Sequence, residues 1–194
     1  MTTFLRHRLW PAIALLIAMT VITGVVYPLV VTVVAQVAFP HQANGSFVVT
    51  VDGRTIGSSL IGQAFSDPKY VWGRPSAAGK DGYDASGSAG SNLGPTSQVL
   101  IDRVTADVDR LQAANGGGPV PVDLVTTSAS GLDPDISPAA ADYQVARVAA
   151  ARGVAEGDIR AAIARHTEEP LLGFLGEPRV NVLLVNLDLD GLLR

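Results

Sequence analysis

The chain opens with one long apolar stretch, and only after it do short apolar and polar patterns alternate. From Leu9 to Pro40 there are 32 consecutive residues without a charge. A bilayer core is crossed by about 20 such residues, whereas the apolar part of a cleaved signal peptide usually spans about 7–15 residues before a small-x-small site. This run is longer, and VVAQVAFP (33–40) has no clean site of that kind. The pattern therefore predicts a transmembrane helix with its outward extension over residues 9–40.

Two prolines lie within this predicted helix. Pro11 suits the first helical turn, where a missing N–H costs nothing. Pro28, close to Gly24, is expected to bend the helix or to mark where it leaves the lipid.

The charges that flank the apolar stretch predict its orientation. Arg6 and Arg8 precede it, and the next basic residue after His41 is Arg54. By the positive-inside rule, residues 1–8 are cytoplasmic and residues 41–194 form an extracytoplasmic domain. We therefore expect a single-pass protein with its N-terminus in the cytoplasm.

The first half of this domain combines β-type and helical patterns. FVVTVDGRTIG (47–57) predicts two short strands joined at Asp52-Gly53, a dipeptide that two-residue hairpin turns prefer. Residues 65–95 are rich in Gly, Ser, Pro and Asp and form a long connection, either ordered and functional or mobile. After it, Thr96 or Ser97 is placed to cap a helix whose apolar residues recur at helical spacing up to Gly116.

The second half continues both kinds of element. PVPVDLVTTS (119–128) is typical of an edge strand because of its prolines. Ser137-Pro138 predicts a helix start with Gly153 as the stop, and GDIRAAIARHT (157–167) predicts a third helix. VNVLLVNLDLD (180–190) alternates apolar and polar residues and predicts a half-buried strand. The fold class is therefore α+β, with one N-terminal transmembrane helix followed by a small sheet on which about three helices pack.

Charge and cysteine content exclude some functions of this domain. Of the 14 Lys and Arg residues 12 follow residue 41, as do all 18 acidic residues, which gives this part a net charge of −6. Such a surface argues against nucleic acid or anionic lipid as a partner. The chain has no cysteine, so it has neither disulfides nor thiol chemistry.

The segment SASGLDPDISPAAA (128–141) concentrates the candidate chemistry. Its serines and aspartates suit either a nucleophile loop or the elaborate start of a helix. A serine nucleophile needs a base, and His166 is the candidate because His41 lies beside the predicted membrane span. No G-x-S-x-G elbow is present. A membrane-anchored periplasmic hydrolase that uses the serine-rich turn and His166 is therefore the alternative function.

Metal and phosphate sites find weaker support. The acidic residues are scattered, with no H-E-x-x-H or EF-hand pattern. We predict no metal site, since a turn explains Asp133-Pro134-Asp135 first. The segment SGSAGSNLGPTS (86–97) precedes a helix and is rich in glycine like a phosphate loop, but lacks the Gly-Lys-Ser/Thr ending.

Several longer motifs resemble one protein family, the C subunit of the bacterial Kdp potassium-transporting ATPase. They occur in the family's order along nearly the whole chain: ITGVVYP (22–28), QANGS (42–46), GSSLIGQAF (57–65), YVWGRPSA (70–77), SGSAGSNLGPTS (86–97), PVDLVTTSASGLDPDISPAAADYQVARVAAARG (121–153) and GEPRVNVLLVNLDL (176–189).

The resemblance implies a non-catalytic subunit of a high-affinity, ATP-driven potassium uptake complex in the bacterial inner membrane. The implied partners are a channel-like potassium-binding subunit, a P-type ATPase subunit and a very small single-span subunit. This chain lacks the Asp-Lys-Thr-Gly motif of such pumps, so no catalytic residue is expected. The serine-rich segment then has a structural or partner-facing task.

The resemblance also implies a catalytic chaperone that raises the ATP affinity of the pump subunit. The residue it points to for nucleotide contact is Gln144, in AADYQVARVA. No cofactor of the chain's own is expected, and ATP enters only through the pump subunit. The predicted orientation conflicts with a nucleotide contact, because ATP is scarce outside the cytoplasm, and we expect Gln144 to be a structural helix residue.

Overall fold

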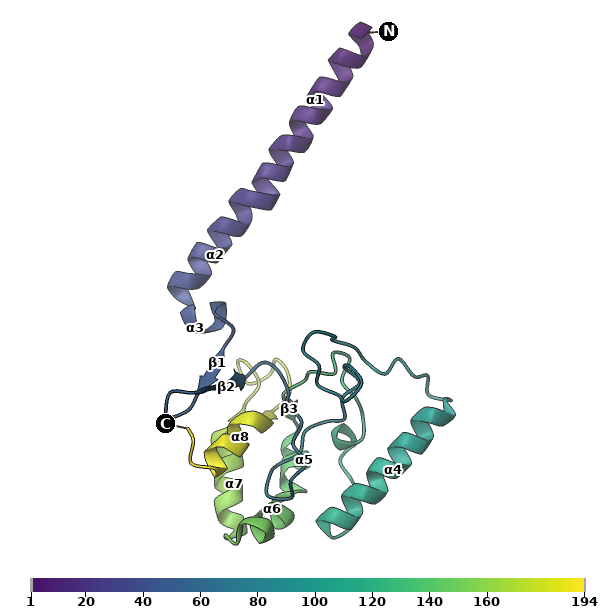
Figure 1. The fold of residues 1–194 in the computed structure, drawn as a ribbon, viewed down its shortest axis with the longest axis vertical. Coiled ribbons are helices and arrows are strands. Elements are labelled where there is room, and N and C mark those ends of the chain that lie inside the picture. Colours follow the sequence, from purple (N-terminus) through teal and green to yellow (C-terminus); the bar gives the residue numbers. More distant parts are fainter. Residues whose placement is uncertain (1, 194) are drawn as a thin grey trace. The chain divides into compact units, whose positions relative to one another are not determined.

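The protein folds into two units in a computed structural model that describes residues 2–193. The first unit ends at Phe47 and the second begins at Val48. Figure 1 shows the first as a run of helices and the second as a mixture of short strands and helices. The predicted α+β class is confirmed.

The first unit is helical over almost all of its long apolar stretch, with an interruption at Phe39. Its elements are α1 (Thr2–Val21), the π-helical turn η1 (Ile22–Val26), α2 (Tyr27–Ala38) and the short α3 (Pro40–Ala43). The continuous helix from Arg6 to Ala38 has 33 residues and a mean hydropathy of 2.4 in its most apolar window. One N-terminal helix is therefore long and apolar enough to cross a membrane, as predicted.

The two prolines behave differently from each other. Pro11 lies inside α1, so its predicted place in the first turn is wrong, because the helix already begins at Thr2. Pro28 is the second residue of α2, which begins where the π-helical turn η1 ends. A proline cannot donate to the carbonyl one turn earlier, and widening the preceding turn accommodates that missing bond.

The second unit begins with the predicted hairpin. β1 (Phe47–Val49) pairs with β2 (Thr55–Ser58). Thr50 N donates to Arg54 O at 2.9 Å, and Gly53, at a φ of +83°, donates to Thr50 O at 2.9 Å. The connection is therefore a three-residue loop that ends in a left-handed glycine, one residue longer than the two-residue turn that we predicted.

A second sheet has three short antiparallel strands. These are β3 (Asp135–Ile136), β5 (Arg179–Asn181) and β4 (Thr167–Glu168), in the order β3-β5-β4. Asp135 lies opposite Asn181, and Glu168 lies opposite Arg179. The sheet thus joins the serine-rich segment to the C-terminal part of the chain.

Two predicted strands are wrong. Residues 119–128 contain no strand but the 3₁₀ turn η2 (Val122–Leu124), in which Leu124 N donates to Pro121 O. Leu124 is buried. In residues 180–190 the strand β5 stops at Asn181 and α8 (Val182–Leu189) follows. The side chain of Asn181 accepts a hydrogen bond from Leu184 N and so caps α8. The alternation of apolar and polar residues predicted a strand with one solvent-facing side, but α8 buries even its polar residue Asn186.

The other helices follow the predictions with one interruption. α4 (Gln98–Asn115) starts after Ser97, which makes no side-chain cap, and ends at Gly116. The helix predicted from Ser137 to Gly153 is two helices, α5 (Pro138–Asp142) and α6 (Val145–Arg152), with a break at residues 143 and 144. α7 (Glu156–Arg165) is the predicted third helix.

The main core of the second unit lies where α5, α6, α7 and α8 meet the three-stranded sheet (Figure 1). Its fully buried residues include Val71, Leu111, Leu124, Val145, Val148, Ile159, Val180 and Val185. Val71 belongs to the long connection, so part of that connection is core.

Candidate functional site

Residues 68–72 begin with a turn, in which Tyr70 N donates to Asp67 O at 3.1 Å, and then run through the second unit. Within residues 2–193 no strand pairs with them. Asn186 of α8 accepts from Val71 N at 2.8 Å and donates to Val71 O at 2.9 Å. Gln144 accepts from Trp72 N at 2.9 Å and donates to Trp72 O at 3.0 Å. Successive residues of an extended chain direct their backbone groups to opposite sides. The two side-chain amides therefore take the place of neighbouring strands.

Gln144 lies in the break between α5 and α6 and is completely buried. Its Nε2 also donates to Ala140 O at 3.1 Å, and its Oε1 also accepts from Arg147 Nη2 at 2.6 Å. A glutamine amide offers two donor hydrogens and two acceptor lone pairs. All four are used inside the domain.

Arg147 completes this arrangement, and neither Arg147 nor Asn186 was predicted from the sequence as a site residue. Its Nη1 donates to Pro68 O at 2.5 Å and to Tyr70 O at 3.0 Å, and its guanidinium lies 3.7 Å from the centre of the Trp72 ring. Burial, and then the charge of Arg110, lower the pKa of Arg147 to about 10, so it stays charged at neutral pH. The only clue in the sequence was its place one helical turn after Gln144.

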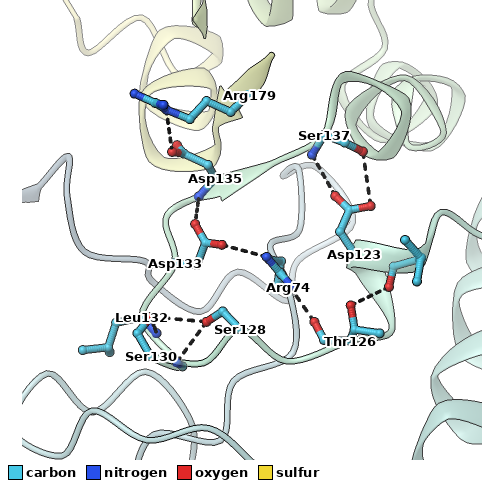
Figure 2. A network of polar contacts seen from close by, with 12 residues as sticks. Arg74, Asp123, Thr126, Ser128, Ser130, Leu132, Asp133, Asp135, Ser137 and Arg179 are labelled. Atoms are coloured by element: carbon cyan, nitrogen blue, oxygen red, sulfur yellow. Dashed lines mark hydrogen bonds and ion pairs between the residues drawn. The ribbon is translucent and has the colours of Figure 1, made fainter. Parts of the chain in front are cut away.

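The serine-rich segment forms a turn whose hydroxyls bond to its own backbone (Figure 2). Ser128 Oγ accepts from Gly131 N at 2.9 Å, and Ser130 Oγ accepts from Leu132 N at 3.1 Å. The two hydroxyl oxygens lie 3.3 Å apart. Such short-range bonds are typical of turns that serine side chains stabilise.

Gly131 is held in this turn by close packing. Its φ is +65°, and a Cβ there would lie 2.5 Å from Ala89 O and 2.8 Å from Ala78 N. Ser76 Oγ donates to Gly131 O at 2.5 Å, and Ala89 N donates to Ser130 O at 2.9 Å. The turn therefore requires glycine at this position, and the long connection is ordered where it meets the turn.

The aspartates of the segment pair with arginines. Asp133 accepts from Arg74 Nη1 at 2.8 Å and from Asp135 N at 3.1 Å. Asp135 lies 3.1 Å from Arg179 Nε (Figure 2). Burial raises the pKa of Asp135, against the opposing effect of Arg179.

The end of the segment is a capped helix start. Ser137 Oγ accepts from Ala140 N at 3.1 Å and caps α5, at the helix start predicted for Ser137-Pro138. Asp123 of η2 accepts from Ser137 N at 2.7 Å and from Ser137 Oγ at 3.2 Å (Figure 2). The segment therefore bonds as a turn and a helix cap.

His166 lies at the end of α7 and is bonded elsewhere. Its Nε2 is 2.9 Å from Asp188 Oδ2, and Arg165 reaches the same oxygen at 2.8 Å. Ser128 and Ser130 bond within their own turn instead. The structure thus does not bring the proposed nucleophile and base together as hydrogen-bonded partners.

Comparison with known proteins identifies the family. Residues 9–191 match the family described as KdpC: K+-transporting ATPase, c chain. The chain belongs to the KdpC family. A potassium-transporting ATPase KdpC subunit of Sorangium cellulosum is 60% identical over 186 residues, which cover 95% of this chain and 97% of that protein. The protein of the same name in Herpetosiphon aurantiacus is 55% identical over 192 residues, covering 98% and 97%.

A third KdpC protein, of Koribacter versatilis, is 54% identical over 187 residues, 96% of each chain. The match to the KdpC family spans the apolar helix, the 68–72 segment and the serine-rich turn. The resemblance that the motifs predicted is confirmed, and the chain is similar to these KdpC subunits along almost its whole length.

Proposed function

We propose that this KdpC family member is a non-catalytic, single-span accessory subunit that supports assembly of a potassium-transporting ATPase and regulates its P-type subunit. One observation carries the proposal. The polar groups of the serine-rich turn and of Gln144 are used in hydrogen bonds within the domain. Groups bound in this way hold a scaffold in shape, whereas catalysis needs a nucleophile beside a base.

The partners that we propose are the channel-like potassium-binding subunit, the P-type ATPase subunit and the small single-span subunit. The apolar helix anchors the chain in the inner membrane beside them. Arg6 and Arg8 support a cytoplasmic N-terminus. In this arrangement the second unit is extracytoplasmic and covers the ion entrance of the channel-like subunit.

For Gln144 we propose a positioning role. The resemblance suggests nucleotide contact, but a nucleotide would have to displace bonds to the backbone of Trp72 and Ala140 and to Arg147. An effect of this subunit on ATP affinity would then pass through the pump subunit. No contact of His166 favours the alternative hydrolase.

Gentle purification of the tagged full chain in detergent tests the proposal. We expect the P-type ATPase subunit to co-purify, and potassium-stimulated ATP hydrolysis to require the whole complex. A chain that is isolated alone and hydrolyses an ester substrate, with the activity lost in Ser130→Ala, would overturn the proposal in favour of the hydrolase.

A further inference from the structure

A short apolar turn projects from the second unit between β4 and β5. Residues 170–176 read PLLGFLG, and the side chains of this turn are exposed although they are large and apolar. The exposed fractions are 70% for Leu171, 76% for Leu172, 72% for Phe174 and 50% for Leu175. Single exposed apolar residues are ordinary, but several on one turn indicate an interaction site.

The turn is preorganised by its own backbone. Leu171 N donates to Leu175 O and Leu175 N donates to Leu171 O, both at 3.0 Å, and Gly173 N donates to Pro170 O at 2.9 Å. Leu172 has a φ of +56°, which is rare for a residue with a bulky side chain. Because the side chain of Leu172 is exposed, its packing inside the domain does not offset the strain of its backbone. Such strain is common at binding sites.

Carboxylates stand on both sides of the apolar turn. Glu169 precedes it and Glu177 follows it, and both are exposed. Among the ion pairs of residues 2–193 neither takes part, whereas the neighbouring Glu168 pairs with Arg179. The turn therefore presents an apolar tip with one exposed carboxylate, free of ion pairs among the described residues, next to each end.

We propose that the turn at residues 170–176 docks into an apolar pocket with a basic rim on another subunit of the potassium-transporting ATPase. The proposal rests on the proposed function, because it takes a subunit of that complex as the partner. The carboxylates decide against the bilayer surface, since anionic headgroups repel them and basic residues attract them. Rigid apolar tips that fill pockets carry much of the binding energy of interfaces.

Two variants and one control test the proposal in the complete complex. Leu172→Asn removes the apolar tip and suits the left-handed backbone, so the domain keeps or gains thermal stability. We expect the chain to leave the detergent-purified complex at least tenfold faster. Val99→Gln, at an α4 residue that is 65% exposed, should dissociate like the wild type. The double variant Glu169→Lys and Glu177→Lys should also dissociate faster than the wild type, and the difference should depend on salt concentration.

Photo-crosslinking identifies the occupant directly. A photoreactive amino acid in place of Phe174, in cells that express all subunits, should yield an adduct with another subunit of the ATPase. Adducts with lipid alone would assign the turn to the bilayer and overturn the proposal. Slower dissociation of the lysine variant from the detergent-purified complex would contradict a basic rim and also overturn it. Wild-type dissociation of Leu172→Asn would overturn it as well. In each case the proposed function stands as long as the wild-type chain co-purifies with the ATPase.

Discussion

Replacing Gln144 with alanine tests whether side-chain amides hold the 68–72 segment. The change removes four hydrogen bonds at a fully buried position. Trp72 N and one N–H of Arg147 lose their acceptor, and Trp72 O loses its donor. The alanine side chain has no hydrogen-bonding group, and it is too small to fill the space that the glutamine side chain occupied.

The expected cost follows from these contacts. A buried polar group left without a partner costs about 1–3 kcal/mol, and the charged Arg147 belongs at the upper end of that range. Relaxation and water entry recover part of the sum. We therefore expect Gln144→Ala to lower the free energy of unfolding by about 3–5 kcal/mol, a large part of the roughly 5–15 kcal/mol typical of a domain. This corresponds to a fall in Tm of roughly 10–20 °C.

Urea unfolding of the full chain in detergent measures the effect. The protein has two tryptophans, and a Trp10→Phe background leaves Trp72, in the segment itself, as the fluorescent reporter. The control is Gln98→Ala, because exposed Gln98 bonds only to Asp102 on the same helix and should cost less than about 0.5 kcal/mol.

A cost for Gln144→Ala no greater than that of the control would refute the reasoning. ATPase assays on complexes of matched stoichiometry address the nucleotide contact. A tenfold rise in the ATP concentration for half activity, with normal domain stability, would show that Gln144 contacts nucleotide after all.

Three further predictions concern topology, the serine-rich turn and pH. Protease added to intact spheroplasts should digest the chain after residue 41, and protection until lysis would reverse the orientation. Gly131→Val should destabilise the domain by about 3 kcal/mol or more in urea unfolding, because Gly131 has a positive φ and the carbonyl of Ala89 lies close to it. Ser130→Ala should lower the free energy of unfolding by only about 1 kcal/mol and should preserve growth at low potassium. Burial raises the pKa of Asp135, so the folded protein binds the proton of this carboxyl group more tightly than the unfolded chain does. The stability of the domain should therefore fall as pH rises from about 4, the ordinary pKa of an aspartate, through the raised pKa of the folded state. Asp135→Asn should remove that component, as measured by urea unfolding across pH.

The helices that the sequence predicted well have one polar and one apolar side and a glycine at the end. α4 is of this kind and ends at the left-handed Gly116. α7 has the two sides but ends at His166, and the left-handed Gly153 ends α6. α8 escaped prediction because it is buried on most of its surface. A helix without a solvent side lacks the 3.6-residue signal, and a chance alternation then reads as a strand.

The candidate site likewise has a part that could be predicted from the sequence and a part that could not. The serine-rich turn was predictable, because its bonds join residues two or three positions apart. The bonds of Gln144 and Asn186 join residues 72 and 115 positions apart. No local pattern encodes such partners, so the break in the helix at Gln144 and the burial of Asn186 were both missed.

Why two amides occupy these places follows from the backbone of the 68–72 segment. The N–H and C=O groups of Val71 and Trp72 lie inside the domain, where each needs a partner, and the helices beside them have used their own backbone groups. Asparagine and glutamine carry a donor and an acceptor side by side on one planar group, and so can match both groups of an extended residue. A neutral imidazole also has one donor and one acceptor, but they point away from each other. A carboxylate would accept from the N–H but repel the carbonyl. The buried amides of Gln144 and Asn186 are thus required by the architecture itself, whatever the subunit binds, and a role in recognition is better sought among exposed groups that no internal contact explains.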